Sequence, residues 1–245
     1  MGSQWDNFLR NLGEWHGSFA SLDANGAVVE TTPSILSLEQ GAEERLVHFR
    51  LRRFADGNLN GEPSRDMQED YRSLGRQVVF FETGTFCKGR LQVSPGTPFG
   101  AEFGFVHGDR RHRLVQLHQE DGCFANLVLI REFRAGSPAD EWPALDSSQL
   151  QGQWSGTAAT ISADWPEPDI ESCSFEMNLS ADPSLQLTWM ADGGYHLTPT
   201  HVDHRSAFAV EAGWLTGPNR LERLIRRYDS SGAWVSATQI IASRG

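Results

Sequence analysis

The chain opens with a helical pattern and then changes to the pattern of strands. Ser3 precedes apolar residues at helical spacing, and Asp6 lies three positions later, as in a capping box, so we predict a short helix that ends at Gly13. Beyond it, alternating or β-branched segments such as 45–51 and 77–81 predict strands. Turn dipeptides separate these segments: Asn25-Gly26, Asp56-Gly57, Pro95-Gly96, Asp121-Gly122, Gly193-Gly194 and Ser231-Gly232. This rhythm predicts an all-β sandwich or barrel.

A break in the strand pattern divides the chain. Residues 135–144 are rich in proline, glycine and acidic residues and show no alternation, which predicts a linker. A single helical turn is expected just after the linker, at 146–150. It would precede the second part of the chain as the first predicted helix precedes the first part. We therefore predict two domains, covering residues 1–140 and 145–245.

The second part of the chain repeats the first. The segment Gly13-Glu14-Trp15 recurs as Gly152-Gln153-Trp154, each time after a predicted helical turn and at the start of a predicted strand. Residues 99–108 align with residues 208–217 without a gap and match Glu102 to Glu211. Self-similarity of this kind is typical of a duplicated structural unit, so the two domains are expected to be related β-barrels.

Composition narrows the class of protein. The 245 residues are 39% hydrophobic, and no apolar run is long enough for a membrane helix, so we expect a cytoplasmic protein without a membrane span. The net charge of -11 disfavours nucleic acid and anionic lipid as partners. Of the 21 basic residues only Lys88 is a lysine, and arginines are well suited to bidentate pairing with carboxylates.

No motif in the sequence indicates a metal, a cofactor or a catalytic nucleophile. Cys87, Cys123 and Cys173 lack the spacing of a thiolate zinc site, and the pair His201 and His204 lacks further ligands beyond Asp203. There is no nucleophile elbow, and the glycine-rich segments do not join a strand to a helix. We therefore expect no metal and no cofactor.

The duplicated Gly-x-Trp, placed after a helical turn and at the start of a strand, resembles the lipocalin-like barrels of the calycin superfamily. The resemblance implies that Trp15 and Trp154 each close one end of a barrel beneath a late basic side chain. Arg131 or Arg134 is the expected partner in the first barrel and Arg244 in the second, through cation-π contact. The other end of each barrel is expected to open onto a ligand cavity.

The segment 211–234 is similar to the S-type phycobilin chromophore lyases, with a Glu, a Trp-centred strand, a Pro-Asn pair and alternating Arg and Leu. Together with residues 5–18, it identifies the chain as a member of a cyanobacterial family of tandem lipocalin-like barrels of unknown function. The sequence departs from the lyase pattern at Leu221, which replaces the first of two arginines, whereas Arg223 keeps the second. This difference counts against covalent bilin attachment more than against bilin binding.

The leading hypothesis is therefore a protein that binds a hydrophobic, carboxylate-bearing small molecule, with a tetrapyrrole such as a bilin expected first because of the resemblance. Aromatic walls would supply the burial energy, and arginines would pair with the carboxylates. The expected ligand-binding residues lie in the second barrel: Trp189, Tyr195, His196, Trp214, Asn219, Arg223, Arg226 and Trp234. The first barrel offers Phe81, Phe86, Phe103, Phe105 and His118. Strand alternation places Glu211 and Trp214 on opposite faces unless a bulge intervenes.

Two alternatives stay open. One is a chromophore lyase or small-molecule isomerase, with Glu211 as the catalytic proton-transfer group and a phycobiliprotein as a partner. The other is a scaffold whose barrels are filled by side chains and whose outer faces contact proteins. A deep pocket in either barrel would count against the scaffold.

Overall fold

The computed structural model describes residues 2–139, 146–177 and 182–244, and nearly all of its regular structure is strand. It begins with helix α1 (Gln4–Leu9). The first sheet contains β1 (Gly13–Asp23), β2 (Val28–Gln40), β3 (Val47–Arg53), β4 (Arg65–Tyr71), β5 (Val78–Phe80), β6 (Phe86–Gly89), β7 (Phe99–His107), β8 (Arg110–His118) and β9 (Phe124–Arg134). The predicted domain boundary at 140–145 lies outside the described residues.

A second sheet follows a single helical turn, η1 (Ser147–Gln149). Its strands are β10 (Gly152–Ser162), β11 (Asp169–Met177), β12 (Leu185–Trp189), β13 (Gly194–Pro199), β14 (Phe208–Gly217), β15 (Arg220–Tyr228) and β16 (Trp234–Ser243), with the turn η2 (Ala191–Gly193) before β13. We call α1 with β1–β9 the first half of the protein and η1 with β10–β16 the second half.

The predicted capping box begins α1. The Ser3 hydroxyl accepts a hydrogen bond from the Asp6 amide at 3.2 Å, and the Asp6 carboxylate accepts one from the Ser3 amide at 2.8 Å. The helix ends at Leu9, earlier than the predicted Gly13. The reason is that the amide of Asn11 bonds to the carbonyl of Phe8, a tighter i to i−3 turn that replaces the helical pattern.

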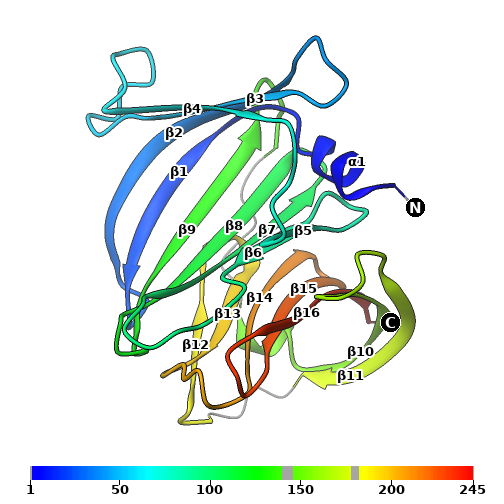
Figure 1. The fold of residues 1–245 in the computed structure, drawn as a ribbon. Coiled ribbons are helices and arrows are strands. Elements are labelled where there is room, and N and C mark those ends of the chain that lie inside the picture. Colours follow the sequence, from blue (N-terminus) through cyan, green and yellow to red (C-terminus); the bar gives the residue numbers. More distant parts are fainter. Residues whose placement is uncertain (1, 140–145, 178–181, 245) are drawn as a thin grey trace.

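Both sheets are antiparallel meanders whose first and last strands pair. The strand order is β4-β3-β2-β1-β9-β8-β7-β6-β5 in the first sheet and β11-β10-β16-β15-β14-β13-β12 in the second. This is the order of a lipocalin-like up-and-down barrel that is opened between its two outer strands. Figure 1 shows the first sheet curling around α1 as a half-barrel. The predicted fold, two all-β units each entered by a helical turn, is confirmed.

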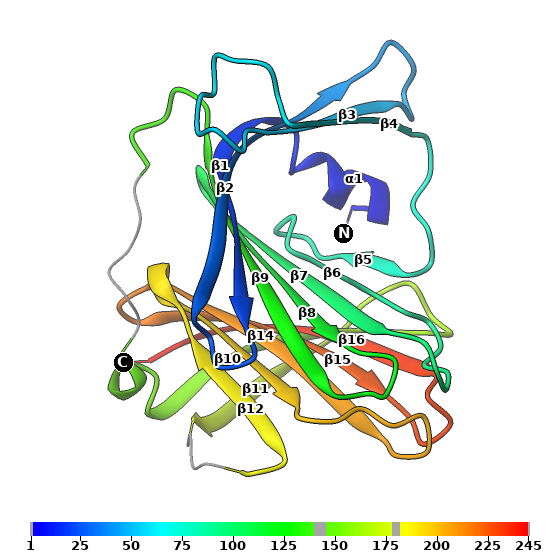
Figure 2. The ribbon, with the colours of Figure 1, turned by 90° about the vertical axis from the view of Figure 1, so that its left-hand side faces the viewer.

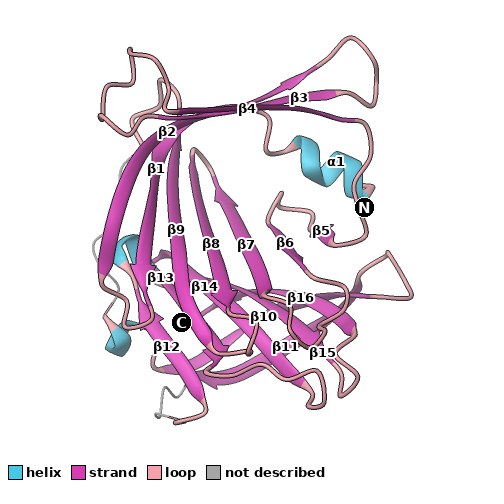
Figure 3. Cartoon of the chain, turned by 60° about the vertical axis from the view of Figure 1, so that its left-hand side comes forward, coloured by secondary structure: helices cyan, strands magenta, loops and turns pink. Residues whose placement is uncertain are grey.

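The two sheets pack against each other through their convex faces (Figures 2 and 3). Phe103 and Phe105 of β7 share one buried cluster with Val210 and Trp214 of β14. The concave face of each sheet has a separate core, which includes Trp15 in the first half and Trp154 in the second. Each strand near the centre therefore presents one face to the other half and one face to its own concave interior.

Equivalent residues of the repeat meet at this contact. Phe99 and its repeat partner Phe208 lie 5.5 Å apart between ring centroids, and Phe105 and Trp214 lie 6.2 Å apart. The backbone contacts are also reciprocal: β6 contacts β15, and the matching pair β13 contacts β8. In a two-fold interface both partners use the same surface, so each contact between two elements recurs between their equivalents. The halves are therefore related as the subunits of a symmetric dimer, within one chain.

The tryptophans of both Gly-x-Trp motifs are fully buried in the concave cores. The indole N–H of Trp15 donates to the carbonyl of Asn11 at 3.0 Å, and that of Trp154 donates to the carbonyl of Leu150 at 2.8 Å. Of the arginines predicted to stack on them, Arg134 lies 4.3 Å from the Trp15 ring centroid and Arg244 lies 5.1 Å from that of Trp154.

A second glycine follows each tryptophan because two strands approach closely there. A Cβ atom on Gly17 would lie 1.9 Å from the carbonyl oxygen of Arg131, and one on Gly156 would lie 2.0 Å from that of Ile241. Only glycine allows β1 to approach β9, and β10 to approach β16, at this distance. The motif thus joins the first strand of each half to its last.

Candidate functional site

The concave interior of the first half contains a cavity of about 330 Å³ between α1, the curled sheet and the segment 72–77. That segment connects the two outer strands, β4 and β5, and so crosses the open side of the half-barrel. Most of the wall is apolar or aromatic: Phe8, Leu36, Leu38, Phe49, Met67, Tyr71, Leu74, Val78, Phe80 and Phe86. Such a wall suits a hydrophobic ligand.

Charged side chains from β7 and β8 form the floor of this cavity, and they bond to Glu132 of β9, which is buried beside them. The carboxylate of Glu132, which is fully buried, accepts a hydrogen bond from Arg111 at 2.7 Å and two from Arg113 at 3.0 Å. Arg113 also donates to Glu102 at 2.9 Å. Glu102, Arg111 and Arg113 line the cavity. We call Glu102, Arg111, Arg113 and Glu132 the ion cluster.

The ion cluster keeps its charges despite burial. Burial raises the pKa of Glu132, but the neighbouring Arg111 and Arg113 outweigh this effect and hold the pKa at about 2. Burial lowers the pKa of Arg111, and Glu132 restores only part of the difference. Arg111 also stacks on Trp15, with its guanidinium carbon 4.9 Å from the ring centroid. The ion cluster is therefore joined to the apolar core around Trp15.

The second half has only part of this arrangement. Its pair Glu211 and Arg223 is bidentate, with distances of 2.8 and 2.9 Å, and corresponds in the repeat to Glu102 and Arg113. The ion pair of Arg111 and Glu132 has no charged counterpart in the second half. Arg111 faces Glu132 across β8 and β9, whereas at the matching positions of β15 and β16 Leu221 faces Ala242. The second half is thus apolar at the two positions where the first half carries a buried ion pair.

Four residues singled out from the sequence gather on the concave face of the second half. Arg223 and the Tyr195 hydroxyl both donate to Glu211, the hydroxyl at 2.6 Å. The ring of Trp189 lies 5.5 Å from that of Tyr195. The carboxylate of Glu211 is thus already bonded to two neighbours from its own half. A ligand-binding or catalytic role for these residues stays a prediction.

The other predicted residues lie elsewhere. Four of them belong to the contact between the halves: His196, Trp214, Arg226 and Trp234. The side chains of Trp214 and Glu211 lie on opposite faces of β14, as regular alternation predicts. Burial, together with the nearby His118, lowers the pKa of His196 to about 3, so its ring is neutral at physiological pH.

Trp214 stacks on His112 at 5.4 Å, and Arg226 lies over Trp234 at 4.8 Å. Asn219 occupies the β14–β15 turn, where it accepts a hydrogen bond from Arg244. The structure thus divides the predicted set between one concave face, the contact of the halves and a turn.

The first-half residues named from the sequence also separate. Phe86 lines the cavity, whereas Phe103, Phe105 and His118 are buried toward the second half. Sequence reasoning missed Arg111, Arg113 and Glu132. A signal for them existed, because Arg111-His112-Arg113 retains the pair of alternating arginines that Leu221 interrupts in the second half.

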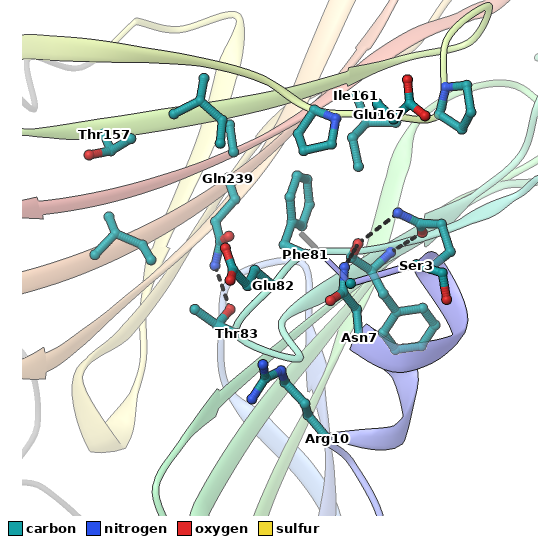
Figure 4. A pocket seen from close by; sticks show the side chains of 18 residues that line it. Ser3, Asn7, Arg10, Phe81, Glu82, Thr83, Thr157, Ile161, Glu167 and Gln239 are labelled. Atoms are coloured by element: carbon teal, nitrogen blue, oxygen red, sulfur yellow. Dashed lines mark hydrogen bonds between the residues drawn. The ribbon is translucent and has the colours of Figure 1, made fainter.

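A larger groove of about 730 Å³ lies between the halves, lined on one side by α1 and the β5–β6 turn, which includes Phe81, and on the other by β10, β11 and β16. Figure 4 shows Gln239 hydrogen-bonded to Thr83 across it, at 2.8 Å. The charged residues that line the groove, Arg10, Glu82 and Glu167, are all exposed to solvent. The groove therefore lacks the buried charges that distinguish the first-half cavity.

Among residues 2–139, 146–177 and 182–244, no group of three His, Cys, Asp or Glu side chains is placed to hold a metal ion. Within the same ranges, no helix has the length and apolar character needed to cross a membrane.

We predict that the cost in stability of removing Glu132 depends on the presence of Arg111. Glu132→Ala leaves Arg111 buried without its carboxylate and should lower the free energy of unfolding by about 3–5 kcal/mol. Adding Arg111→Leu recreates the pair Leu221 and Ala242 of the second half and should recover most of the loss. Urea unfolding of the single and double variants measures the cycle. If the double variant is as unstable as Glu132→Ala, the halves do not tolerate the exchange and the prediction is wrong.

The ion cluster should also make stability sensitive to acid. The pKa of Glu132 is about 2 in the folded protein and near 4.5 in an unfolded chain. Its stabilisation is therefore fully present above pH 4.5 and is lost as the pH falls toward 2. We expect the free energy of unfolding to fall less steeply between pH 4.5 and 2.5 in the double variant Arg111→Leu, Glu132→Ala than in the unmodified protein. Equal slopes would show that Glu132 contributes nothing to acid sensitivity.

Comparison with known proteins identifies the family. A profile of the N-terminal domain of DUF3598, a domain of unknown function, matches residues 1–137, and the C-terminal domain profile of Biogenesis factor required for ATP synthase 1 matches residues 174–245. A search of curated protein sequences finds no match. A crystal structure of a DUF3598 family protein of unknown function from Nostoc punctiforme is 35% identical, with full coverage of both chains and a TM-score of 0.90.

Two more distant structures are also similar to the chain. The S-type phycobiliprotein lyase CpeS from Guillardia theta is 12% identical, with a TM-score of 0.21 and coverage of 100% of this chain and 93% of that one. A putative outer membrane protein from Bacteroides fragilis is 9% identical, with a TM-score of 0.27 and coverage of 99% and 100%. These two scores are too low to support an inference. The full-length match and the matched profile show that this chain belongs to the DUF3598 family.

Proposed function

We propose that the protein binds a hydrophobic small molecule in the cavity of the first half. The observation that carries the proposal is the combination of an aromatic and aliphatic wall with the buried ion cluster on its floor. Apolar walls supply affinity, and a few fixed polar groups orient the ligand. A polar end of the ligand would lie at Arg111 and Arg113, and its apolar body would lie against Phe49, Met67 and Phe86.

The size of the cavity limits how much of a ligand it can enclose. A cavity of roughly 150 Å³ holds a benzene ring, so about 330 Å³ corresponds to two rings. A linear tetrapyrrole, the ligand first expected from the sequence resemblance, would keep about half of its rings outside, beside the segment 72–77. A bicyclic molecule or one acyl chain would fit more completely.

The experiment is a titration of protein from a pigment-free host with bilins, chlorophyll precursors and fatty acids, followed by absorbance and by tryptophan fluorescence. We expect at least one compound to bind, and the double variant Arg111→Leu, Glu132→Ala to weaken its binding about tenfold or more because the polar end loses its partner. Arg223→Leu is the matched control in the second half and should change affinity less than about twofold.

Two results would contradict this proposal. If no compound binds, the cavity is not a ligand site for these classes. If Arg223→Leu alone weakens binding, the site is the second-half group of Glu211, Arg223, Tyr195 and Trp189.

A lyase activity would further require that adduct formation between a bilin and an apo-phycobiliprotein is faster than the spontaneous reaction. Glu211 would then have to exchange its hydrogen bonds from Tyr195 and Arg223 for bonds to the substrate.

We infer a second candidate function, in protein assembly, from the profile that matches residues 174–245. The name of that profile describes a biogenesis factor required for ATP synthase. If the second half shares this role, purified protein should bind isolated ATP synthase directly in size-exclusion chromatography. Val235→Glu, which alters an exposed apolar side chain of β16, serves as a surface variant that should weaken such a complex. Elution of all components at their separate volumes would contradict the assembly role.

A further inference from the structure

Strand β11 is an outer strand of the second sheet, and its outward edge has no pairing partner among the described strands (Figure 1). It is 9 residues long and keeps one continuous register with β10, without a bulge. An edge strand of this kind presents a row of unpaired backbone N–H and C=O groups, to which another strand can add. The edge of β11 is therefore a candidate site for strand addition.

The repeat shows what covers the corresponding edge in the first half. The counterpart of β11 is β2, because Trp15 pairs with Leu36 of β2 as Trp154 pairs with Phe175 of β11. In the first half, β3 pairs with the outer edge of β2, and β4 extends the sheet further. No described strand of the second half takes the place of β3. The edge that is covered in one half is thus open in the other.

Apolar side chains at the open edge stay partly exposed. Phe175 is only partly buried, whereas its counterpart Leu36, which has β3 beside it, is 2% exposed. Ile170 at the start of β11 and Trp165 in the turn before it are 49% and 63% exposed. Aromatic residues are enriched where proteins contact one another, and tryptophan often contributes much of the binding energy. These side chains therefore favour a protein partner at this edge.

The charge of the edge selects among partners. The segment 163–177 contains no lysine or arginine, and its acidic residues are all exposed: Asp164, Glu167, Asp169, Glu171 and Glu176. Pairing with β11 of a second copy would bring like charges together, which is unfavourable across a strand pair. A basic strand would instead place opposite charges across the pair. The charge therefore favours a basic segment of another protein over a second copy of this chain.

Strand β3 indicates the pattern of such a partner. Its Leu51 and Arg50 lie opposite the two β2 positions that correspond to Phe175 and Glu176 of β11. A strand with the pattern of β3 would therefore place an apolar residue beside Phe175 and an arginine opposite Glu176. Both pairs are favourable between neighbouring antiparallel strands.

We propose that β11 is a docking edge for an extended segment of another protein in which basic residues alternate with apolar ones. The segment adds to the second sheet as an antiparallel strand, with a basic side chain opposite Glu176 and an apolar side chain beside Phe175. This inference goes beyond both proposed functions because it uses neither the first-half cavity nor Val235.

Calorimetric titration of the full chain with a synthetic peptide of residues 46–54, which include β3, tests the proposal. We expect saturable binding, with hydrogen-exchange protection of backbone amides in residues 169–177. Glu176→Arg should weaken binding about fivefold, because two arginines then face each other, and a peptide with Arg50→Glu should recover most of this loss. Glu30→Arg makes the same change in net charge on β2 and should alter the affinity less than about twofold.

A second peptide tests whether the backbone of the segment is used. With N-methyl groups on its backbone amides from 47 to 53, it lacks the N–H donors of a strand and should not bind. Equal binding of the methylated peptide would overturn strand addition, and so would protection confined to the first half or no binding of the unmodified peptide. A dimer in sedimentation that Glu176→Arg dissociates would also overturn the proposal, because a second copy would then cover the edge.

Discussion

The contact between the two convex faces determines the rest of the structure. A curled sheet has two faces to cover, and each half covers its convex face with that of the other, through equivalent residues such as Phe99 and Phe208. Because this contact uses one side of every central strand, the opposite side is left for the concave interior. The cavity of the first half and the group of Glu211, Arg223 and Tyr195 in the second half both lie in these concave interiors.

Duplication then allowed the two interiors to differ. Both keep a glutamate and arginine pair, Glu102 with Arg113 and Glu211 with Arg223. Only the first half adds the buried pair of Arg111 and Glu132, where the second half has Leu221 and Ala242. A buried ion pair is a weak source of stability compared with apolar packing. Its presence beside a cavity therefore fits binding better than stability.

The sequence predicted the architecture well because the duplicated features are local. The Gly-x-Trp motifs, the turn dipeptides and the gapless match of 99–108 to 208–217 each follow from nearby residues. The site was harder to predict because it depends on which face of a strand a residue occupies and on what covers that face. His196, Trp214, Arg226 and Trp234 looked like ligand contacts, but the second sheet buries them against the first half.

The ligand site that we propose lies in the first half, and equivalent cavity-filling substitutions in the two halves distinguish it from a site in the second half. Val78 of β5 lines the first-half cavity, and its repeat counterpart Leu187 of β12 lies on the concave face of the second half. For any ligand that binds, the affinity of Val78→Trp is compared with that of Leu187→Trp. We predict that Val78→Trp abolishes binding and that Leu187→Trp leaves it unchanged. Loss of binding in Leu187→Trp alone would contradict a first-half site and place the ligand in the second half.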